Sequence, residues 1–565
     1  MEKPRDINAN NLEKIRIQCL DEFVQLLEST IEERVLLNEL IEKVKISKET
    51  KDLSDVVSTV IQASQTAREQ ENCPIAIDLL EKAISCLLSS FNSDSSSKDH
   101  LLLKIDLLKE LSESFYCKGN LDKVVDVENE LCTIYETIND FKEYIESKIK
   151  IGILFLFKGQ YTRSHDILYG ALSLTDNLSE EEKHIILPEL YRTLAISYRG
   201  YGDYEKALEL FLNALNGFQR IKNSMKLSKT HWGIALLYNL RGEWEKSVEK
   251  YDLIFKKYLS PKSPQNKEKL LGYHLDLYLD LSEPLILSGE YEKAEEVLHK
   301  ASDIVQKHSK IQNAGYRLYL QFTKLYISRK MFHEALDTLH KAQSSWRTSK
   351  EECCDISEMQ LLELETEILI KLDEQDKARK KLEVIFPNLK NEWDIATWYL
   401  LLGNIEKKDL NLGSAQQAFE KAIAKAKEIS YFQLTLTCQQ VYTSLLIERA
   451  RLGDQKAFEE ATNQIEEIQT EVQTKSMPAM ILETRILRAN LFAAQKNYEI
   501  AYQILSEVEE NAKTMNLNRQ RIVAQEILES LEKDQFQLKS GVERLNDFQV
   551  LKYLQDARRI VREGQ

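Results

Sequence analysis

The stretch LYRTLAISYRGYGDYEKALELFLNALNGF, residues 190–218, contains the pattern that the rest of the chain repeats. Its first half has apolar and small residues at helical spacing, a Gly202-Asp203 break follows, and a second helical face begins at Tyr204. The stretch therefore predicts two antiparallel helices joined by a tight turn. The positions that define the pattern are Tyr191, Leu194, Ala195, Tyr198, Gly202, Tyr204, Ala207, Phe211 and Ala214.

These positions closely resemble the signature of a tetratricopeptide repeat. The resemblance covers roughly residues 57–515 and implies an all-α fold, a right-handed α-solenoid of about eleven helical hairpins with helical caps. Longer-repeat members of this superfamily include kinesin light chains, spindle-orientation scaffolds and peptide-sensing regulators of bacteria. The resemblance thus implies binding of proteins or peptides without identifying the partner.

Small residues recur where the two helices of each hairpin are expected to cross, because closely approaching axes leave no room for larger side chains. The crossing position of the second helix holds Ala76, Val124, Ser164, Ala207, Ser247, Ala294, Ala335, Ala378, Ala415 and Ala501. The matching position of the first helix holds Ser64, Ser112, Gly152, Ala195, Ala235, Ser282, Thr323, Thr366, Gly403 and Ala489. One further unit is expected in 431–475, with Ala457 or Ala461 at its crossing.

Glycine marks the turn in the early units, at Gly119, Gly159, Gly202, Gly242 and Gly289, where a positive φ ends the first helix. Later units carry Lys330, Asp373 and Lys496 instead. Residues 1–50 do not match the repeat and predict an N-terminal helical cap. Residues 51–515 form the predicted array, and 516–565 predict C-terminal capping helices.

The composition and charge of the chain disfavour several classes of function. The chain of 565 residues has only 17 Gly and 8 Pro, which favours long helices, and its formal charge of −15 disfavours binding to nucleic acid. Its longest apolar runs, such as 151–157, fall far short of the ~20 residues that span a bilayer, so no membrane span is expected. The eight Cys form no dense framework, and we expect a cytoplasmic protein with reduced thiols.

No pattern points to catalysis. The sequence has no phosphate-binding loop and no HExxH motif, and His333 and His340 lie ~10.5 Å apart along one helix face, too far to share a metal ion. Acidic neighbours of Cys353-Cys354 disfavour a reactive thiol pair. We therefore predict no catalytic residue, no metal and no cofactor, and a chain that is not an enzyme.

The candidate binding residues lie on the first helices, which line the inner wall of a stacked array. The predicted groove residues are Arg192, Arg199, Lys229, Trp232, Asn239, Arg317 and Lys324. The same stripe also holds Asp276, Glu283, Glu363, Glu367, Asn404 and Lys407. A mildly basic groove with an aromatic anchor predicts an acidic helix or extended peptide as partner. The alternative is that Trp232 fills a gap between units and the charges are solvated surface.

A receptor for chaperone tails is disfavoured. Such domains use a clamp of Lys and Asn on successive first helices; Asn404 and Asn490 fit, but Leu400 and Ile486 stand where Lys is needed. Two functions stay open: a non-enzymatic scaffold that binds a partner protein or peptide along the concave groove, and a peptide- or ligand-responsive regulator whose superhelix changes curvature, with a hinge near 258–268. The sequence does not specify the oligomeric state.

Overall fold

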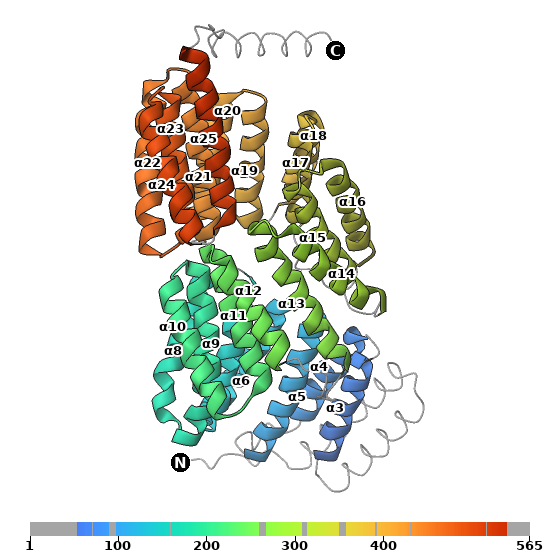
Figure 1. Cartoon of the computed structure of the whole chain (residues 1–565). Helices are drawn as coiled ribbons and strands as arrows, with labels where there is room; N and C mark the ends of the chain where they lie inside the picture. The colour runs from blue at the N-terminus through green and yellow to red at the C-terminus, as the bar shows by residue number, and fades with distance from the viewer. Residues whose placement is uncertain are drawn as a thin grey trace, which may run out of the picture. The chain divides into compact units, whose positions relative to one another are not determined.

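The structure is a computed structural model, and it describes residues 54–69, 72–89, 98–158, 160–258, 267–307, 314–349, 358–389, 392–429, 432–515 and 517–539 (Figure 1). Within these ranges the chain is all-α, with 23 α-helices, α3 to α25, and no strand. The predicted cap at residues 1–50 lies outside the described residues. Of the predicted C-terminal cap, the structure describes the helix α25.

Successive helices form the hairpins that the repeat pattern predicts. The first helices are α3 (Ser54–Glu69), α5 (Lys98–Cys117), α7 (Phe141–Phe157), α9 (Glu180–Tyr201), α11 (Ser224–Arg241), α13 (Lys267–Leu287), α15 (Ala314–Ser328), α17 (Glu358–Lys371), α19 (Glu392–Lys408), α21 (Phe432–Arg451) and α23 (Pro478–Ala494). The second helices are α4 (Cys73–Ser89), α6 (Leu121–Thr137), α8 (Tyr161–Ser173), α10 (Tyr204–Arg220), α12 (Trp244–Leu253), α14 (Tyr291–Lys307), α16 (Phe332–Ser349), α18 (Gln375–Ile385), α20 (Leu412–Glu428), α22 (Gln455–Thr474) and α24 (Tyr498–Thr514). Helix α25 (Asn518–Lys539) follows the eleventh described pair.

The predicted crossing positions are among the best-buried places in the hairpins. All ten crossing residues of the second helices are 0% exposed. At two of them the side chain also bonds the first helix, since the hydroxyls of Ser164 and Ser247 donate to the carbonyls of Gly152 and Ala235 at 2.9 and 2.8 Å. A Cβ atom placed on Gly403 would lie 2.4 Å from the Phe419 ring, so the close approach requires a small residue.

The predicted turns that the structure describes share one conformation whether or not they contain glycine, and Gly159 lies outside the described residues. Gly202 has φ +76°, and the NH groups of Gly202 and Asp203 bond back to carbonyls of the last turn of α9. Lys330, Asp373 and Lys496 adopt φ values of 60°, 59° and 63° at the corresponding place in their hairpins. The left-handed turn therefore persists in the later units, at the cost of backbone strain that glycine avoids.

The unit in 432–475 also takes its predicted hairpin form, as α21 and α22. Ala457 and Ala461, the two candidates for its crossing residue, are both buried in one cluster with α19, α20 and α21 side chains. They lie one helical turn apart and share a face, so both small residues serve the packing of α22.

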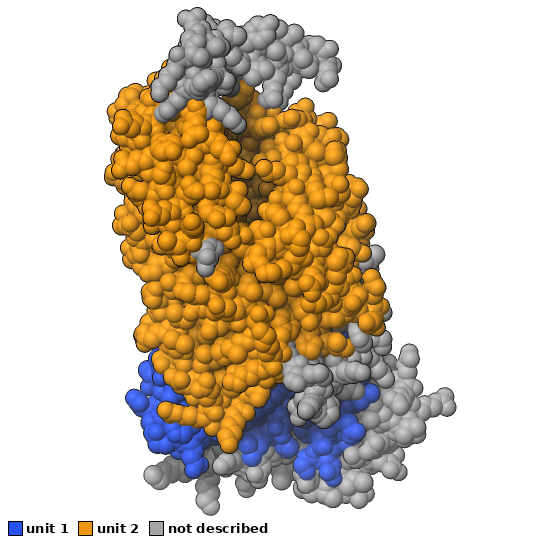
Figure 2. Space-filling view, in the orientation of Figure 1, with its two compact units in different colours: residues 1–158, 163–193, 352–354 blue, residues 159–162, 194–351, 355–565 orange. Residues whose placement is uncertain are grey.

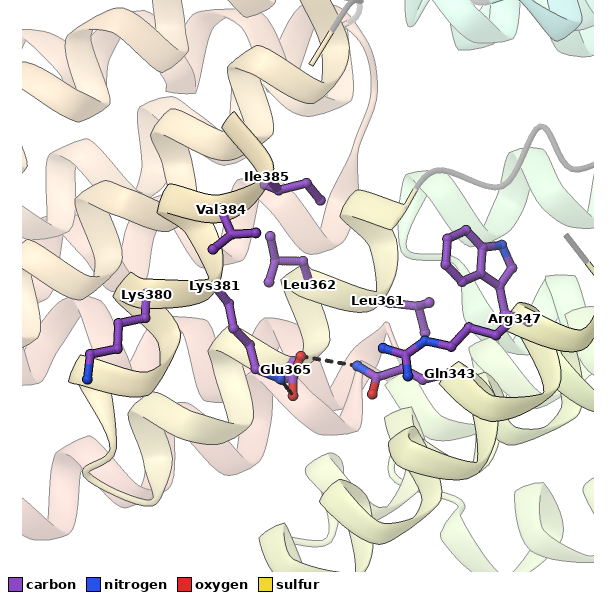
Figure 3. A pocket seen from close by; sticks show the side chains of 10 residues that line it. Gln343, Arg347, Leu361, Leu362, Glu365, Lys380, Lys381, Val384 and Ile385 are labelled. Atoms are coloured by element: carbon purple, nitrogen blue, oxygen red, sulfur yellow. Dashed lines mark hydrogen bonds and ion pairs between the residues drawn. The ribbon is translucent and has the colours of Figure 1, made fainter. Parts of the chain in front are cut away.

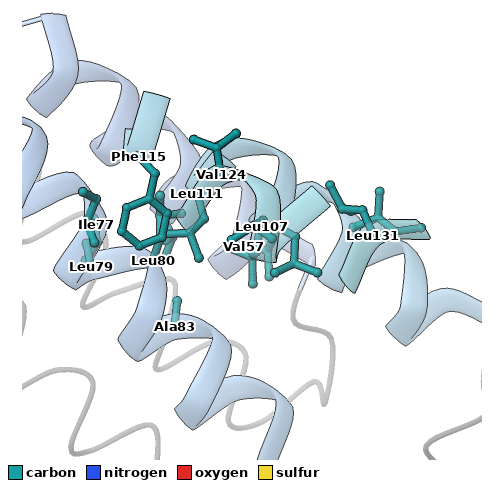
Figure 4. Close-up of a cluster of buried hydrophobic side chains, with 14 of the residues drawn as sticks. Val57, Ile77, Leu79, Leu80, Ala83, Leu107, Leu111, Phe115, Val124 and Leu131 are labelled. Atoms are coloured by element: carbon teal, nitrogen blue, oxygen red, sulfur yellow. The ribbon is translucent and has the colours of Figure 1, made fainter. Parts of the chain in front are cut away.

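The chain divides into two compact units, coloured separately in Figure 2. The first comprises residues up to 158 together with 163–193, and the second comprises 159–162, 194–351 and 355–565. The core of the first unit is a cluster from α3 to α7 in which Val57, Leu107 and Leu111 meet Phe115 and Leu131 (Figure 4). Burial of these apolar side chains, worth about 1.5–3 kcal/mol each, holds the hairpins together.

Within the second unit, hairpins far apart in sequence touch. The ammonium of Lys475 donates to the carbonyls of Tyr201 and Gly202, each at 3.3 Å, and burial lowers the pKa of Lys475. Trp244, 4% exposed, packs in one cluster with Ala479 of α23. The repeat pattern does not predict these two contacts, which join the fourth hairpin to the tenth and the fifth hairpin to the eleventh.

Candidate functional site

All seven predicted groove residues lie on first helices: two on α9, three on α11 and two on α15. Arg192 belongs to the first compact unit, and the other six belong to the second. Arg192 forms an ion pair with Glu189, one turn earlier on α9, and both side chains are partly buried. Its charge is therefore balanced within its own helix.

Trp232 is part of the contact between α11 and α13. Its indole Nε1 donates to Asp280 Oδ2 at 2.9 Å, and its ring meets Tyr273 edge-on with the centroids 5.5 Å apart. Burial raises the pKa of Asp280 to about 6, although the positive charge of Arg317 and the hydrogen bond from the indole both act to lower it. These contacts support the interpretation that Trp232 fills a gap between neighbouring hairpins. Asp280 was missing from the predicted groove, although it follows Asp276 by one helical turn.

The acidic face of α13 binds donors from the helices on both sides. Asn239 of α11 donates its amide to Glu283 at 3.3 Å, and Lys324 of α15 lies 3.5 Å from the same carboxylate. Arg317 of α15 forms an ion pair with Asp276. With Trp232, four of the predicted groove residues are therefore engaged by α13, and this part of the array offers a ligand less positive charge than the sequence suggests.

A cavity of about 590 Å³ lies on the first helices α17, α19 and α21. The helix α17 and its neighbours α19 and α21 each contribute both polar and apolar side chains to its wall. The lining residues are Glu363, Thr366, Glu367, Ile370, Lys371, Leu400, Leu401, Asn404, Lys407, Lys408, Leu410, Thr437, Val441 and Glu448. Cavities of this size are typical of small-molecule and peptide side-chain sites.

Two carboxylates of this cavity, unlike those of α13, have no partner among the described residues. Among the described residues, Glu363 and Glu367 make no hydrogen bond or ion pair. Both side chains reach solvent, yet the surrounding protein displaces part of their hydration, and this desolvation raises the pKa of both. The positive field of Lys324 opposes the shift at Glu363, while Lys371 and Arg519 oppose it at Glu367.

Two of the three lysines in the same cavity already have partners, whereas Lys371 makes no ion pair among the described residues. Lys407 donates to Ser444 Oγ at 2.8 Å and lies 3.0 Å from Glu448. Lys408 lies 2.9 Å from Asp373. The sequence places Glu363 and Glu367 on the inner stripe but does not show that they are unpaired, because the spacing along one helix does not reveal which charges the neighbouring helices supply.

A second cavity, of about 420 Å³, lies on α16, α17 and α18 (Figure 3). At its centre Glu365, 3% exposed, accepts a hydrogen bond from Gln343 at 3.1 Å and forms an ion pair with Lys381. Leu361, Leu362 and other aliphatic residues supply much of the remaining wall. Because its central carboxylate is satisfied, this cavity is a weaker candidate for a ligand site than the one on α17, α19 and α21.

Two of the described thiols, those of Cys132 and Cys438, are poor nucleophiles. Burial raises the pKa of Cys132 to about 11 and that of Cys438 to about 12, and the charge of Glu363 adds to the shift of Cys438. Within the described ranges, no group of three or more His, Cys, Asp or Glu side chains is placed to hold a metal ion. Cys353 and Cys354 lie outside the described residues. Of the helices that the structure describes, none combines the length and apolar character needed to cross a bilayer.

No protein-family model matches the chain. Over 255 residues it is 24% identical to the TPR repeat-containing protein MJ1428 of Methanocaldococcus jannaschii, a match that spans 38% of this chain and 43% of that protein. The match thus covers less than half of either chain.

Solved structures similar to this chain include three of low sequence identity. Yeast Tom70 is 13% identical, with 86% of this chain and 97% of that one covered and a TM-score of 0.41. A tetratricopeptide repeat protein from Parabacteroides merdae is 21% identical, with 52% and 98% covered and a TM-score of 0.33. A Rap protein complexed with Competence and Sporulation Factor is 9% identical, with 70% and 98% covered and a TM-score of 0.37.

Proposed function

The chain is a tetratricopeptide-repeat protein, and from this premise we propose that it is a non-enzymatic scaffold that binds a partner protein or peptide along its first helices. The cavity on α17, α19 and α21 is the observation that carries the proposal, because three successive first helices contribute to one hollow. A ligand there contacts several repeats at once, and its affinity is the sum of a few contacts from each.

The seven predicted groove residues remain part of this proposal, and four of them take a structural role in it. Trp232, Asn239, Arg317 and Lys324 hold α11, α13 and α15 together. An acidic partner stays a prediction of the sequence, and the pairing of these cations with α13 weakens its physical basis. The cytoplasmic location belongs to the same proposal and rests on the scattered cysteines of the sequence.

Site-specific photo-crosslinking tests the proposal. A photoreactive amino acid replaces Asn404 in the cavity wall, and the matched control replaces Asn463, an exposed residue of the second helix α22. We expect the Asn404 variant to form a crosslinked polypeptide in its native host that the Asn463 variant does not form. A polypeptide that crosslinks only to position 463 would place the interaction on the second helices and contradict the proposal.

A ligand-responsive regulator is the second candidate, and the contact of Lys475 with Tyr201 and Gly202 favours it. A change in curvature between these distant hairpins would stretch or break that contact, so a ligand between them would be coupled to it. Small-angle scattering distinguishes the two functions. A radius of gyration that changes with a saturating peptide supports the regulator, and an unchanged radius supports the scaffold.

A further inference from the structure

We propose that the cavity on α17, α19 and α21 binds a Lys or Arg side chain of a basic partner segment, with Glu363 and Glu367 as its acceptors. This inference rests on the proposed function and specifies the chemistry of the ligand. The two glutamates lie four residues apart on α17, so their side chains project from one face with their Cβ atoms ~6 Å apart. One ammonium or guanidinium group can contact two carboxylates at that spacing.

The acceptors are available because the protein itself does not use them. Neither Glu363 nor Glu367 makes a hydrogen bond or ion pair among the described residues, and both reach solvent. The positive charges of Lys324, Lys371 and Arg519 act to lower the pKa values of these glutamates through space, and none of them forms an ion pair with either glutamate. A bound cation would therefore gain two acceptors and displace no existing partner.

A buried hydroxyl supports a polar ligand independently of the acidic pair. Thr366 lies between the two glutamates on α17, lines the same cavity and is 1% exposed, and its Oγ1 has no hydrogen-bond partner. An unsatisfied buried hydroxyl destabilises the fold unless a ligand or water meets it. Asn404, across the cavity on α19, likewise makes no hydrogen bond in the described part and offers an amide oxygen as a further acceptor.

Within the described residues the wall offers a cation more unengaged partners than an anion, since Glu363 and Glu367 are both unpaired and Lys371 is the one unpaired lysine. Lys407 and Lys408 are engaged by Glu448 and Asp373, so an acidic ligand would have to compete with those ion pairs. Ile370, Leu400 and Val441 line the cavity beside the carboxylates. The methylene stem of Lys or Arg packs on such apolar surface while its charged end reaches the acceptors.

A positional-scanning array of synthetic nonapeptides, probed with the full-length fluorescently labelled chain, tests the charge preference directly. We expect one peptide position at which Lys or Arg is preferred over Gln and Glu by about tenfold or more, as two charge-assisted hydrogen bonds imply. Glu363→Gln with Glu367→Gln should remove the preference. The matched control is Glu459→Gln with Glu466→Gln, which removes two exposed carboxylates from the second helix α22 and should leave the preference intact.

The outcomes separate this inference from the function on which it rests. Binding peptides that show no preference for Lys or Arg, or a preference that survives in the Glu363→Gln, Glu367→Gln protein, would overturn the inference and leave the scaffold function standing. If no peptide binds, the inference and the peptide-binding function fail together. Unchanged far-ultraviolet circular dichroism and melting of both double variants ensures that a lost preference reflects the site and not the fold.

Discussion

Helices α13 and α17 carry acidic side chains at corresponding places in their repeats, but the structure uses them differently. Glu283 and Glu367 each follow the crossing residue of their helix by one position, Ser282 in α13 and Thr366 in α17. Glu283 meets Lys324 from the equivalent position of the next first helix, whereas Glu367 faces a wall that carries Asn404 at that position. A carboxylate of the stripe is therefore structural or available to a ligand according to the residue that the next repeat supplies.

The largest expected effect comes from removing the aromatic centre of the paired region. Trp232→Ala deletes the ring that packs on Tyr273 and leaves Asp280 without its indole donor. Substitutions of this kind cost about 3 kcal/mol. We expect hydrogen–deuterium exchange to accelerate by about a hundredfold in peptides from α11 and α13, since 1.4 kcal/mol corresponds to a factor of ten.

Leu212→Ala is the control for this prediction, because Leu212 is 49% exposed on α10 and its truncation should leave exchange in α11 and α13 unchanged. Unaltered exchange in the Trp232→Ala protein would show that the tryptophan is not structural. It would then be available as the ligand anchor that the sequence suggested.

Asp280 gives the paired region a pH dependence. Its pKa is raised by burial from 3.8 to about 6, so the folded state holds the proton more tightly than the unfolded state does. Its contribution to stability is therefore most favourable below pH 4 and is lost as the pH rises towards 6. Besides the indole of Trp232, the charges on Arg317, Glu283 and Asp276 act on this carboxyl group.

Asp280→Asn keeps an acceptor for the indole and removes the desolvated charge. We expect the variant to gain about 3 kcal/mol of unfolding free energy at pH 7.5, and the gain to shrink as the pH falls through 6. Urea unfolding at several pH values measures it, with Asp337→Asn on the exposed face of α16 as control. A constant difference across that pH range would exclude Asp280 as the titrating group.

Asn404→Lys would reproduce the α13 arrangement on α17. It supplies a lysine at the position that Lys324 occupies two repeats earlier, within the cavity that holds Glu363 and Glu367. We expect the affinity for a cationic peptide to fall about fivefold, equivalent to about 1 kcal/mol. Fluorescence anisotropy with the best Arg-containing peptide from the array measures the change, and Asn463→Lys on α22 adds the same charge outside the cavity as a control. Equal losses in both variants would mean that only net charge matters.

Much of the fold could be predicted from the sequence because it depends on local size and spacing. The small residues at Ala207 and Ala415 lie where the periodicity placed them, fully buried. The turns at Lys330 and Lys496 were harder to predict, since a left-handed residue other than glycine is an exception that the packed hairpin on either side imposes. The contact of Lys475 with Tyr201 could not be predicted, because no repeat pattern specifies which distant hairpins meet.

The candidate site was harder to predict for a related reason. Helical periodicity places Trp232 and Lys324 on first helices, and the structure agrees. Whether such a residue faces a ligand or a neighbouring helix depends on the side chain offered one repeat away, and that pairing has no signature within a single repeat. Asp280 is absent from the predicted groove because it lies two residues before the crossing residue Ser282, at a position that the predicted inner stripe does not include. The groove residues as a binding site remain a prediction.

The smallest expected effect comes from breaking the ion pair that distinguishes α13 from α17. Lys324 lies 3.5 Å from Glu283, and both side chains are more than a third exposed, so water screens much of their attraction. Lys324→Met should therefore change the unfolding free energy by no more than about 0.5 kcal/mol. The same change removes the positive field at Glu363, so that carboxylate should take up a proton at higher pH than in the parent protein. Nuclear magnetic resonance titration of the glutamate carboxyl carbons measures this shift, with Lys427→Met on α20 as the control. A loss above about 1.5 kcal/mol would show that the pair is a main support of the α13–α15 contact, and the two regions would then differ in stability as well as in charge.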